Sequence, residues 1–254
     1  MIQTNMATRL LLRKLTSDEL AEAEVYASNL AYPNSAVDRE KLLSNLSVSL
    51  FHYYYESTDI LLMDGAFPVE IDEAMVGFGF NVGPYEIQDT LGLERFYQER
   101  RKRIPIQDPK RRYIPIADRM VEEGRLGRPT NVGWYRYPGG KGKVDDPLVE
   151  DLVAEESHFA KVTRREFSVE EIQERVICAL VNASANRFDE FPELTICDLD
   201  CVISECLGFP VTQGGLIFYA NKIGLEKISE KISMFAKEDP VIWKLSSHFS
   251  RLQI

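Results

Sequence analysis

The stretch LGFPVTQGGLIFYANKIGL, residues 207–225, repeats the glycine pattern of an earlier stretch, FGFNVGPYEIQDTLGL, residues 78–93. Each contains a Gly-Phe pair, then a second glycine, and nine residues later a third glycine that leucine follows. Ile71-Asp72 precedes the first copy and Leu199-Asp200 precedes the second. Chance is one explanation, because glycine turns before amphipathic helices are common. The other, which we favour, is internal duplication of a helical unit.

Length and composition limit the classes of protein to which this chain can belong. The chain has 254 residues, 44% of them hydrophobic, which suits one large or two modest globular domains. Its net charge of −10 repels phosphate backbones, so we expect no nucleic-acid partner. The basic cluster at Gln98–Arg112 is interpreted as a solvated helix end running into a loop. No apolar run approaches the ~20 residues that a membrane span needs.

Cysteine spacing and the first residues bear on the compartment. The four cysteines lie between Cys178 and Cys206 without a Cys-x-x-Cys pair, so we expect reduced, buried thiols and no metal site. Residues 1–17 carry Arg9, Arg13 and Lys14 without an acid, which is similar to a mitochondrial presequence. No long apolar region follows them, and the expected location is cytoplasmic.

Capping signals predict a mainly helical chain. A helix is expected from Thr16 to about Leu30, and a long one from Ala36 to Met63 that Gly65 ends. Its aromatic run FHYYY is interpreted as buried packing. Further starts are expected at Gly83-Pro84 (running through Gln98), Pro115, Asp146-Pro147, Ser168, Thr195, Gly215 and Pro240. Residues 133–144 predict a short extended hairpin.

Three stretches resemble the C-terminal helical domain of the L-3-hydroxyacyl-CoA dehydrogenase family, in the tandem form of multifunctional fatty-acid β-oxidation enzymes. They are GAFPVEIDEAM…GFGFNVGPYEIQDTLGL (residues 65–93), GRLGRPTNVGWYRY (residues 124–137) and LVNASANRF…CDLDCVISECLGFPVTQGG (residues 180–215). The resemblance implies an all-α fold of two tandem related repeats, like the C-terminal domain of 6-phosphogluconate dehydrogenase. The implied parts are a remnant of a preceding nucleotide-binding domain (1–35), a first repeat (36–137), a linker and helix (138–167) and a second repeat (168–254).

The resemblance also implies hydride transfer between a 3-hydroxyacyl-CoA and NAD, with a His–Glu pair as the general base. NAD would need a glycine fingerprint on a strand–turn–helix unit, and no Gly-x-Gly-x-x-Gly occurs in this sequence. We therefore expect no cofactor bound by this chain alone, and NAD only through a partner domain.

The catalytic positions of the family are also changed. Its glutamate position falls on Arg9 or Leu10, and its Asn-Arg pair falls on Val48-Ser49 or on Ser47-Val48. Pro129 replaces a lysine, and Ser184 stands where the second repeat usually has glutamate. The histidines match no catalytic position and are interpreted as surface or core residues; they are His52, His158 and His248. No catalytic residue is therefore expected here.

Three functions stay open. The chain is half of a split dehydrogenase that works with a separate NAD-binding chain, an acyl-CoA-binding module that assembles with a β-oxidation enzyme, or a non-enzymatic dimerisation scaffold. A homodimer is expected in each case. The candidate contacts to the CoA phosphates are Arg100, Arg101, Lys102 and Arg103. The candidate motif and interface residues are Gly79, Phe80, Gly83, Pro84, Asp89, Asn182, Gly208, Phe209 and Gly215.

Overall fold

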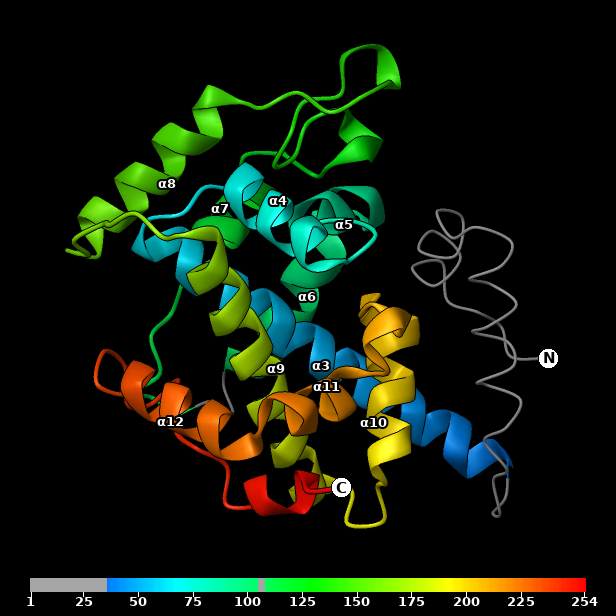
Figure 1. Cartoon of the computed structure of the whole chain (residues 1–254). Coiled ribbons are helices and arrows are strands. Elements are labelled where there is room, and N and C mark those ends of the chain that lie inside the picture. The colour runs from blue at the N-terminus through cyan, green and yellow to red at the C-terminus, as the bar shows by residue number, and fades with distance from the viewer. Residues whose placement is uncertain (1–35, 105–107) are drawn as a thin grey trace. The chain divides into compact units, whose positions relative to one another are not determined.

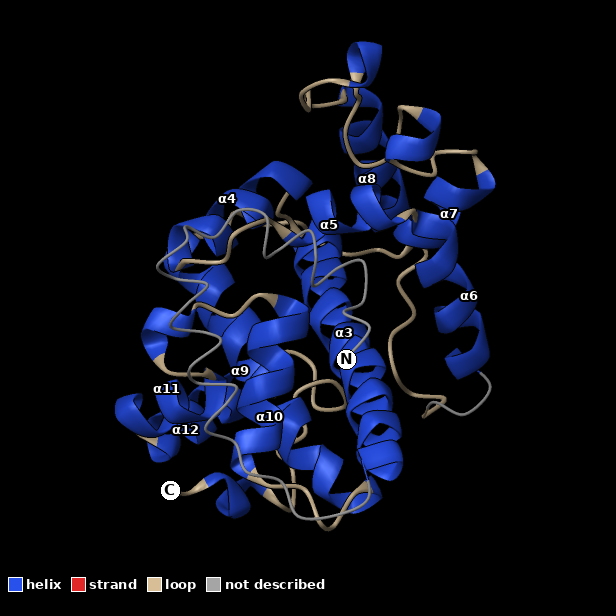
Figure 2. Ribbon diagram, turned by 90° about the vertical axis from the view of Figure 1, so that its right-hand side faces the viewer, coloured by secondary structure: helices blue, strands red, loops and turns tan. Residues whose placement is uncertain are grey.

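A computed structural model describes residues 36–104 and 108–254. Within them every named element is helical, and Figure 2 draws only helices and loops for this part of the chain. The all-α class expected from the sequence is confirmed. The helix expected from Thr16 to Leu30 and the proposed segment 1–35 lie outside the described residues. Among the helices that are described, none is long and apolar enough to cross a membrane.

The chain forms two compact units that alternate along the sequence. Of the described residues, unit 1 comprises 36–54, 79–81 and 176–254, and unit 2 comprises 55–78, 82–104 and 108–175. The long helices α3 (Ala36–Asp64) and α9 (Val169–Glu190) therefore contribute residues to both units. The domain boundaries expected from the sequence stay a prediction.

Figure 1 labels the remaining α-helices. Each remaining element belongs to one unit. Unit 2 holds α4 (Pro68–Phe78), α5 (Pro84–Leu91), α6 (Leu93–Arg103), α7 (Ile116–Glu122), α8 (Pro147–Phe159) and 3-10 turns at Arg128–Thr130 and Pro138–Gly140. Unit 1 holds α10 (Ile196–Val202), a π-turn (Ile203–Leu207), α11 (Leu216–Ile223), α12 (Leu225–Phe235) and 3-10 turns at Val211–Gln213 and Phe249–Leu252.

The end of α3 follows the expectation from the sequence. Gly65 has a φ of 151°, and its amide donates to the Leu61 carbonyl at 3.0 Å. A Cβ at Gly65 would lie 1.8 Å from the carbonyl oxygen of Arg165, so a side chain has no room there. In the aromatic run, Tyr54 and Tyr55 are 0% and 5% exposed, which confirms that they pack in the interior.

The prediction of a single helix from Pro84 through Gln98 is wrong, because α5 and α6 are separate helices. Gly92 stands between them with φ 85° and ψ 125°, a conformation that glycine adopts far more readily than other residues. The next amide, of Leu93, donates to the Leu126 carbonyl at 3.2 Å and so leaves the helical pattern. Gly224 makes the same break between α11 and α12, with φ 105° and ψ 116°.

The two stretches that share a glycine pattern also share a helix cap. Asp72 accepts hydrogen bonds from the amides of Tyr85 and Glu86 at the start of α5. Asp200 accepts them from the amides of Ile217 and Phe218 at the start of α11, at 2.6 and 3.2 Å. Each carboxylate satisfies amides that have no partner inside the helix, and its charge suits the positive end of the helix dipole.

A glycine precedes both capped helices because the capping carboxylate occupies the space that a side chain at this position would fill. A Cβ at Gly83 would lie 2.2 Å from Cγ of Asp72, and one at Gly215 would lie 2.5 Å from Cγ of Asp200. The two glycines therefore have the same function in the two units. Duplication of the whole helical unit stays our interpretation of this likeness.

A π-turn distinguishes the second copy of the pattern. Gly79 follows Asp72 by seven residues, whereas Gly208 follows Asp200 by eight. The π-turn at Ile203–Leu207 lies inside the longer segment, and the Gly208 amide donates to the Ile203 carbonyl five residues earlier. Because a π-turn holds one more residue than an α-turn, it accommodates the extra residue without moving the glycine out of place.

Other expected helix starts are confirmed in part. Asp146 accepts from the Leu148 amide at 3.3 Å, and Thr195 forms a reciprocal capping box with Asp198. The Ser168 hydroxyl accepts from the Glu171 amide at 3.2 Å, but the Glu171 carboxylate instead pairs with two arginines, Arg165 and Arg175. The helix start expected at Ser168 is confirmed, and its capping box is only half formed.

The helix expected at Pro240 is wrong. Residues after it form turns, although the Asp239 carboxylate caps the first of them through the Val241 amide at 3.1 Å. Asn182 on α9 prevents continuation, because its amide nitrogen donates to the Lys244 carbonyl and its oxygen accepts from the Ser246 amide, both at 2.9 Å. A tertiary contact thus decides the local structure, and it gives Asn182 a structural role.

The hairpin expected at residues 133–144 is present only as an irregular excursion. Isolated antiparallel bridges join Val132 to Arg136 and Arg136 to Val144. A 3-10 turn at Pro138–Gly140 reverses the chain, and Gly139 there has a φ of 64°. The segment therefore depends on side-chain contacts with α4 and α5 to hold its shape.

Candidate functional site

Asp72 lies on α4 and caps α5 from outside that helix. Its Oδ1 accepts the Tyr85 amide at 2.8 Å, and its Oδ2 accepts the Glu86 amide at 3.1 Å. The Tyr135 hydroxyl donates to Oδ2 at 2.8 Å, and the Lys143 ammonium lies 3.6 Å from it. Burial raises the pKa of Asp72 to about 6, against the lowering effects of Lys143 and of these hydrogen bonds. This carboxylate joins α4, α5 and the 133–144 excursion.

Asp89 on α5 holds the same excursion from the other side. It accepts the amides of Trp134 and Tyr135 and the hydroxyl of Tyr137, all at 2.9 Å. The neighbouring Gln88 accepts the Trp134 indole N–H at 3.2 Å. Burial raises the pKa of Asp89 to about 7, although these donors lower it. The candidate residue Asp89 is therefore placed in a buried structural contact.

Asp59 on α3 is the least satisfied of the buried carboxylates in unit 2. The Tyr85 hydroxyl lies 3.4 Å from it, which is a weak hydrogen bond. Burial raises the pKa of Asp59 to about 7, while Arg100 lowers it. Together these side chains form what we call the carboxylate network, comprising Asp59, Asp72, Asp89, Tyr85, Tyr135 and Tyr137.

Asp59→Asn is expected to stabilise the protein at pH 8 and to leave its stability unchanged near pH 4. The pKa of Asp59 is higher in the folded protein than in the unfolded chain, so folding favours the protonated carboxyl. The contribution of Asp59 to the free energy of unfolding is fully present below about pH 4. It is lost as the pH rises through about 7, because the folded protein must then bury a charge. Urea unfolding across this range measures the difference, expected at about 2–4 kcal/mol at pH 8. The exposed Asp151→Asn serves as the control; a destabilised Asp59→Asn at pH 8 contradicts the argument.

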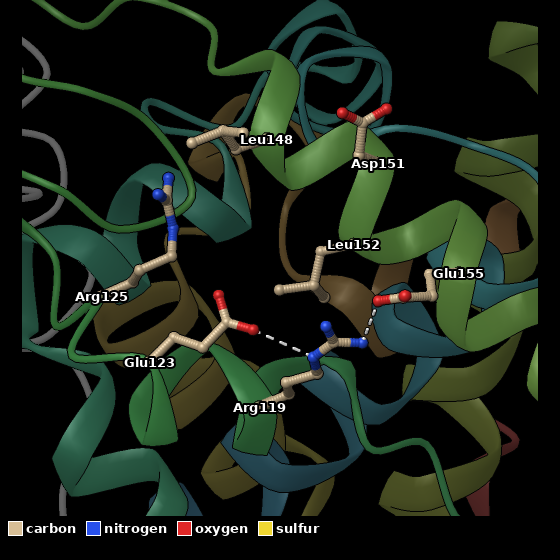
Figure 3. A pocket seen from close by; sticks show the side chains of 7 residues that line it. All are labelled: Arg119, Glu123, Arg125, Leu148, Asp151, Leu152 and Glu155. Atoms are coloured by element: carbon tan, nitrogen blue, oxygen red, sulfur yellow. Dashed lines mark hydrogen bonds and ion pairs between the residues drawn. The ribbon is translucent and has the colours of Figure 1, made fainter.

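A pocket lies between α7 and α8 in unit 2, with a volume of about 280 Å³ (Figure 3). In the view of Figure 3, Arg119 lies between Glu123 and Glu155 at one side of the pocket, and Leu152 lies above these three side chains. The side chains that line it are Arg119, Glu123, Arg125, Leu148, Asp151, Leu152 and Glu155.

Both cations of the pocket are already neutralised. Arg119 lies 3.0 Å from Glu123 and 2.6 Å from both Glu155 and Glu156. Arg125 lies 2.5 Å from Asp146 and also donates to the Gly133 carbonyl. Carboxylates outnumber guanidinium groups around this space, so its electrostatics are unfavourable for the phosphates of CoA.

Arg100, a candidate CoA-phosphate contact, is turned into the interior of unit 2. Its guanidinium lies 2.6 Å from Asp118, and the side chains of this pair are 16% and 4% exposed. The Tyr113 hydroxyl donates to the other Asp118 oxygen at 2.5 Å. Arg100 therefore joins α6 to α7, and a ligand phosphate would have to displace a buried carboxylate to reach it.

Two more arginines of the basic cluster hold the chain between α6 and α7 onto α3. Arg111 donates two hydrogen bonds to Glu56 at 2.6 and 2.5 Å. Arg112 donates two to Asp64 at 2.7 and 3.0 Å. Forked pairs of this kind fix geometry more strongly than single contacts. Much of the basic cluster therefore stabilises unit 2.

The other three candidate cations stand on the last turn of α6. Arg101 is exposed and lies over the Tyr97 ring at 5.8 Å, and Lys102 lies 2.7 Å from Glu99. Arg103 is half-buried. Cations favour the negative end of a helix dipole, so this arrangement stabilises α6 without any ligand. Contact of these residues with CoA phosphates stays a prediction.

In unit 1 the candidate motif residues are buried, except for the exposed Gly79. The rings of Phe80 and Phe209 meet edge to face with centroids 5.8 Å apart, and each residue is 2% exposed. Gly79 and Gly208 precede them with φ of 122° and 75°. In unit 2, Pro84 is buried at the first position of α5. A role for these residues at an interface stays a prediction.

The histidines are spread over both units. Nε2 of His248 lies 2.6 Å from Oδ1 of Asp189 on the surface of unit 1. His52 packs against the Tyr53 ring at 5.2 Å, and His158 is exposed beside Phe159. The pair that the family uses as a general base combines histidine with glutamate. His248 is paired with an aspartate instead.

The expectation of buried thiols is right for Cys178 and wrong for the exposed Cys197. Cys201 and Cys206 are half-buried.

The sequence did not reveal the side chains that hold the excursion. The hydroxyls of Tyr135 and Tyr137 donate to Asp72 and Asp89, and Lys143 lies 4.5 Å above the Tyr135 ring. The signal was present in GWYRY, where Tyr135 and Tyr137 stand two residues apart and, in an extended segment, turn to the same side. Which carboxylates they would meet depended on the packing of α4 and α5.

Comparisons with known proteins agree with this architecture. The profile of the family "3-hydroxyacyl-CoA dehydrogenase, C-terminal domain" matches residues 48–137. The chain is 32% identical over 202 residues to the peroxisomal bifunctional enzyme of Cavia porcellus, covering 74% of this chain and 28% of that protein. It is 27% identical over 202 residues to the peroxisomal fatty acid beta-oxidation multifunctional protein of Oryza sativa subsp. japonica, covering 78% and 28%.

A solved structure shows the same fold. It is the dehydrogenase part of multifunctional enzyme 1 from C. elegans, with a TM-score of 0.59 and 23% identity, covering 80% of this chain and 46% of that one. The chain thus spans about a quarter of the length of the curated relatives that it matches.

Proposed function

Residues 48–137 belong to the 3-hydroxyacyl-CoA dehydrogenase C-terminal domain family, and on that premise we propose that this chain is an acyl-CoA-binding helical module linked to fatty-acid oxidation. In this proposal the NAD-binding part of a dehydrogenase comes from another domain or chain. The names of the relatives, which are bifunctional and multifunctional enzymes of fatty-acid oxidation, support the metabolic link.

The changed catalytic positions carry the proposal. The family's asparagine position falls on α3 at Ser47 or Val48, and Val48 is 39% exposed. Ser49 accepts a hydrogen bond from Arg187 within unit 1, which gives it a structural task. A valine side chain has no polar group to replace the amide. A serine hydroxyl has a single donor hydrogen, and the Ser47 hydroxyl already donates to the Ser44 carbonyl at 2.8 Å.

NAD does not fit the residues that are present. The 254 residues contain no Gly-x-Gly-x-x-Gly, and the described part has no strand from which such a turn could lead into a helix. Hydride transfer by these residues alone is therefore not part of the proposal.

A second candidate, a non-enzymatic dimerisation or assembly scaffold, is favoured by one observation. Arg100, Arg111 and Arg112 are engaged in internal ion pairs, so the basic cluster is needed for the fold itself. The scaffold keeps the fold without the ligand. Sedimentation of the purified chain tests the expected homodimer. The cytoplasmic location expected from the sequence also stays a prediction, checked by imaging the tagged chain.

An assay of NADH oxidation with acetoacetyl-CoA tests the need for a partner. The chain alone is expected to show no activity above the blank, because in this proposal the nucleotide site and the His–Glu base come from the partner. Addition of a separately produced NAD-binding domain of the same family is the second arm. Turnover by the chain alone contradicts the proposal.

Removing charge from α6 tests its role in binding. A triple variant, Arg101→Ala with Lys102→Ala and Arg103→Ala, leaves the structural Arg100 in place. If these cations contact the CoA phosphates, its affinity for acetoacetyl-CoA falls at least about tenfold. Wild-type affinity in a folded triple variant rejects that role. The control variant removes exposed charges of unit 1 at Lys227 and Lys237.

A further inference from the structure

Arg119, at one side of the pocket between α7 and α8, is surrounded by more negative charge than it can balance. Its guanidinium lies 3.0 Å from Glu123 and 2.6 Å from both Glu155 and Glu156. One positive charge offsets one of these three negative charges, and the rest is left over. The side chains of Glu123 and Glu155 are 46% and 47% exposed, so a ligand from solvent can reach them.

Asp151 adds to this surplus of negative charge. It lines the same pocket, stands one helical turn before Glu155 on α8, and makes no ion pair with any residue that the structure describes. Residues four apart lie on the same side of a helix. Arg125, the other cation of the pocket, lies 2.5 Å from Asp146 and is not available to balance Asp151. The pocket therefore favours a ligand with positive charge.

The same pocket has an apolar wall. Leu148 and Leu152 are also four residues apart on α8, and both line the space of about 280 Å³ (Figure 3). Leu152 is 5% exposed, whereas Leu148 is 65% exposed. A ligand that covers Leu148 removes apolar surface from water, which favours binding. The wall therefore suits an aliphatic group, and the carboxylates suit a cation attached to it.

We propose that this pocket binds a primary ammonium group on an aliphatic chain, as found in a lysine side chain or a free diamine. The methylene groups contact Leu148, and the ammonium binds Asp151 and the two exposed glutamates, Glu123 and Glu155. An ammonium has three donors that can turn toward carboxylates of different elements, whereas a planar guanidinium suits one carboxylate in a forked pair. The site goes beyond the acyl-CoA binding proposed above, because its charge repels the CoA phosphates.

A nuclear magnetic resonance titration of the isotope-labelled full chain tests the site. Cadaverine is the free diamine, and acetyl-Ala-Leu-Lys-Leu-Ala-amide presents a lysine side chain. Each is expected to shift the α8 amide signals around Asp151 saturably, with a Kd on the order of 1 mM that rises with salt. The controls are 1-pentanol and the same peptide with norleucine in place of lysine, which keep the aliphatic chain without the charge.

The outcomes of this titration separate the sources of the ammonium. Saturation by the peptide alone supports a lysine side chain of a protein partner, saturation by cadaverine alone supports a free amine, and saturation by both supports the shared chemistry. If neither amine shifts the α8 signals, or if the uncharged controls bind as tightly as the amines, the proposal is overturned.

Two variants with a matched control test the residues. Asp151→Asn is expected to weaken binding of the saturating amine about fivefold, because it removes one charge from the pocket. Leu148→Ser is expected to weaken it about threefold through the lost apolar contact. Glu150→Gln removes an exposed acid next to Asp151 on α8 that does not line the pocket, and it should leave the affinity unchanged. Wild-type affinity in Asp151→Asn, or an equal loss in Glu150→Gln, overturns the proposed site.

Discussion

Asp89→Ala is expected to lower the free energy of unfolding by at least about 3 kcal/mol, because it leaves three buried donors without an acceptor. The donors are the amides of Trp134 and Tyr135 and the hydroxyl of Tyr137. Each lost partner costs about 1–3 kcal/mol, and the residue they surround is 0% exposed. Urea unfolding followed by tryptophan fluorescence measures the loss, because Trp134 lies in the affected segment.

Two controls separate this effect from a general loss of charge. Asp89→Asn keeps one oxygen acceptor and is expected to fall between the wild type and alanine. Asp145→Ala removes an exposed acid that directly follows the excursion and is expected to change stability by less than about 0.5 kcal/mol. If Asp89→Ala unfolds at the wild-type urea concentration, the excursion does not depend on Asp89 and our account of the carboxylate network is wrong.

Gly83→Ala and Gly215→Ala are each expected to destabilise the protein by about 3 kcal/mol or more. The added methyl group meets the capping carboxylate of Asp72 at 2.2 Å or of Asp200 at 2.5 Å, so the carboxylate must leave its helix start. Gly83 has an ordinary φ of −70°, so Gly83→Ala is destabilised only by the collision with Asp72. Gly215 has a φ of 112°, so Gly215→Ala also suffers backbone strain.

Gly77→Ala is the matched control. Gly77 lies within α4, and the nearest atom to an added Cβ is 3.8 Å away on the flexible Gln173 side chain. Since alanine favours a helix over glycine by about 1 kcal/mol, this variant is expected to be as stable as the wild type or more so. Thermal unfolding of the three variants measures their stabilities side by side. If Gly83→Ala is as stable as the wild type, the Asp72 carboxylate does not need the space beside Gly83.

The local features of the fold could be predicted from the sequence. Gly65 ends α3, Pro84 begins α5 and Thr195 begins α10 as expected, because each acts within a few residues of itself. The family could be recognised for the same reason, since its motifs are short turns with fixed glycines. Both findings rest on interactions between neighbours in the chain.

The remaining features depend on contacts between distant residues. The sequence suggested Arg100 as a ligand contact, but its guanidinium forms an ion pair with Asp118. Nothing in the spacing of these two residues along the chain predicts the pair. Pro240 looked like a helix start until Asn182 bound the segment after it. Asp72 caps a helix that begins twelve residues later, so the usual search for a cap directly before the helix misses it.

Calorimetric titration of the folded chain with acetoacetyl-CoA, in the absence of NADH, tests most directly the central claim that this module binds acyl-CoA without performing the reaction. The account predicts saturable binding in the micromolar range, with pantetheine, which lacks the nucleotide phosphates, binding more weakly. Absence of binding by a chain that circular dichroism shows to be helical would contradict the account and support the scaffold instead.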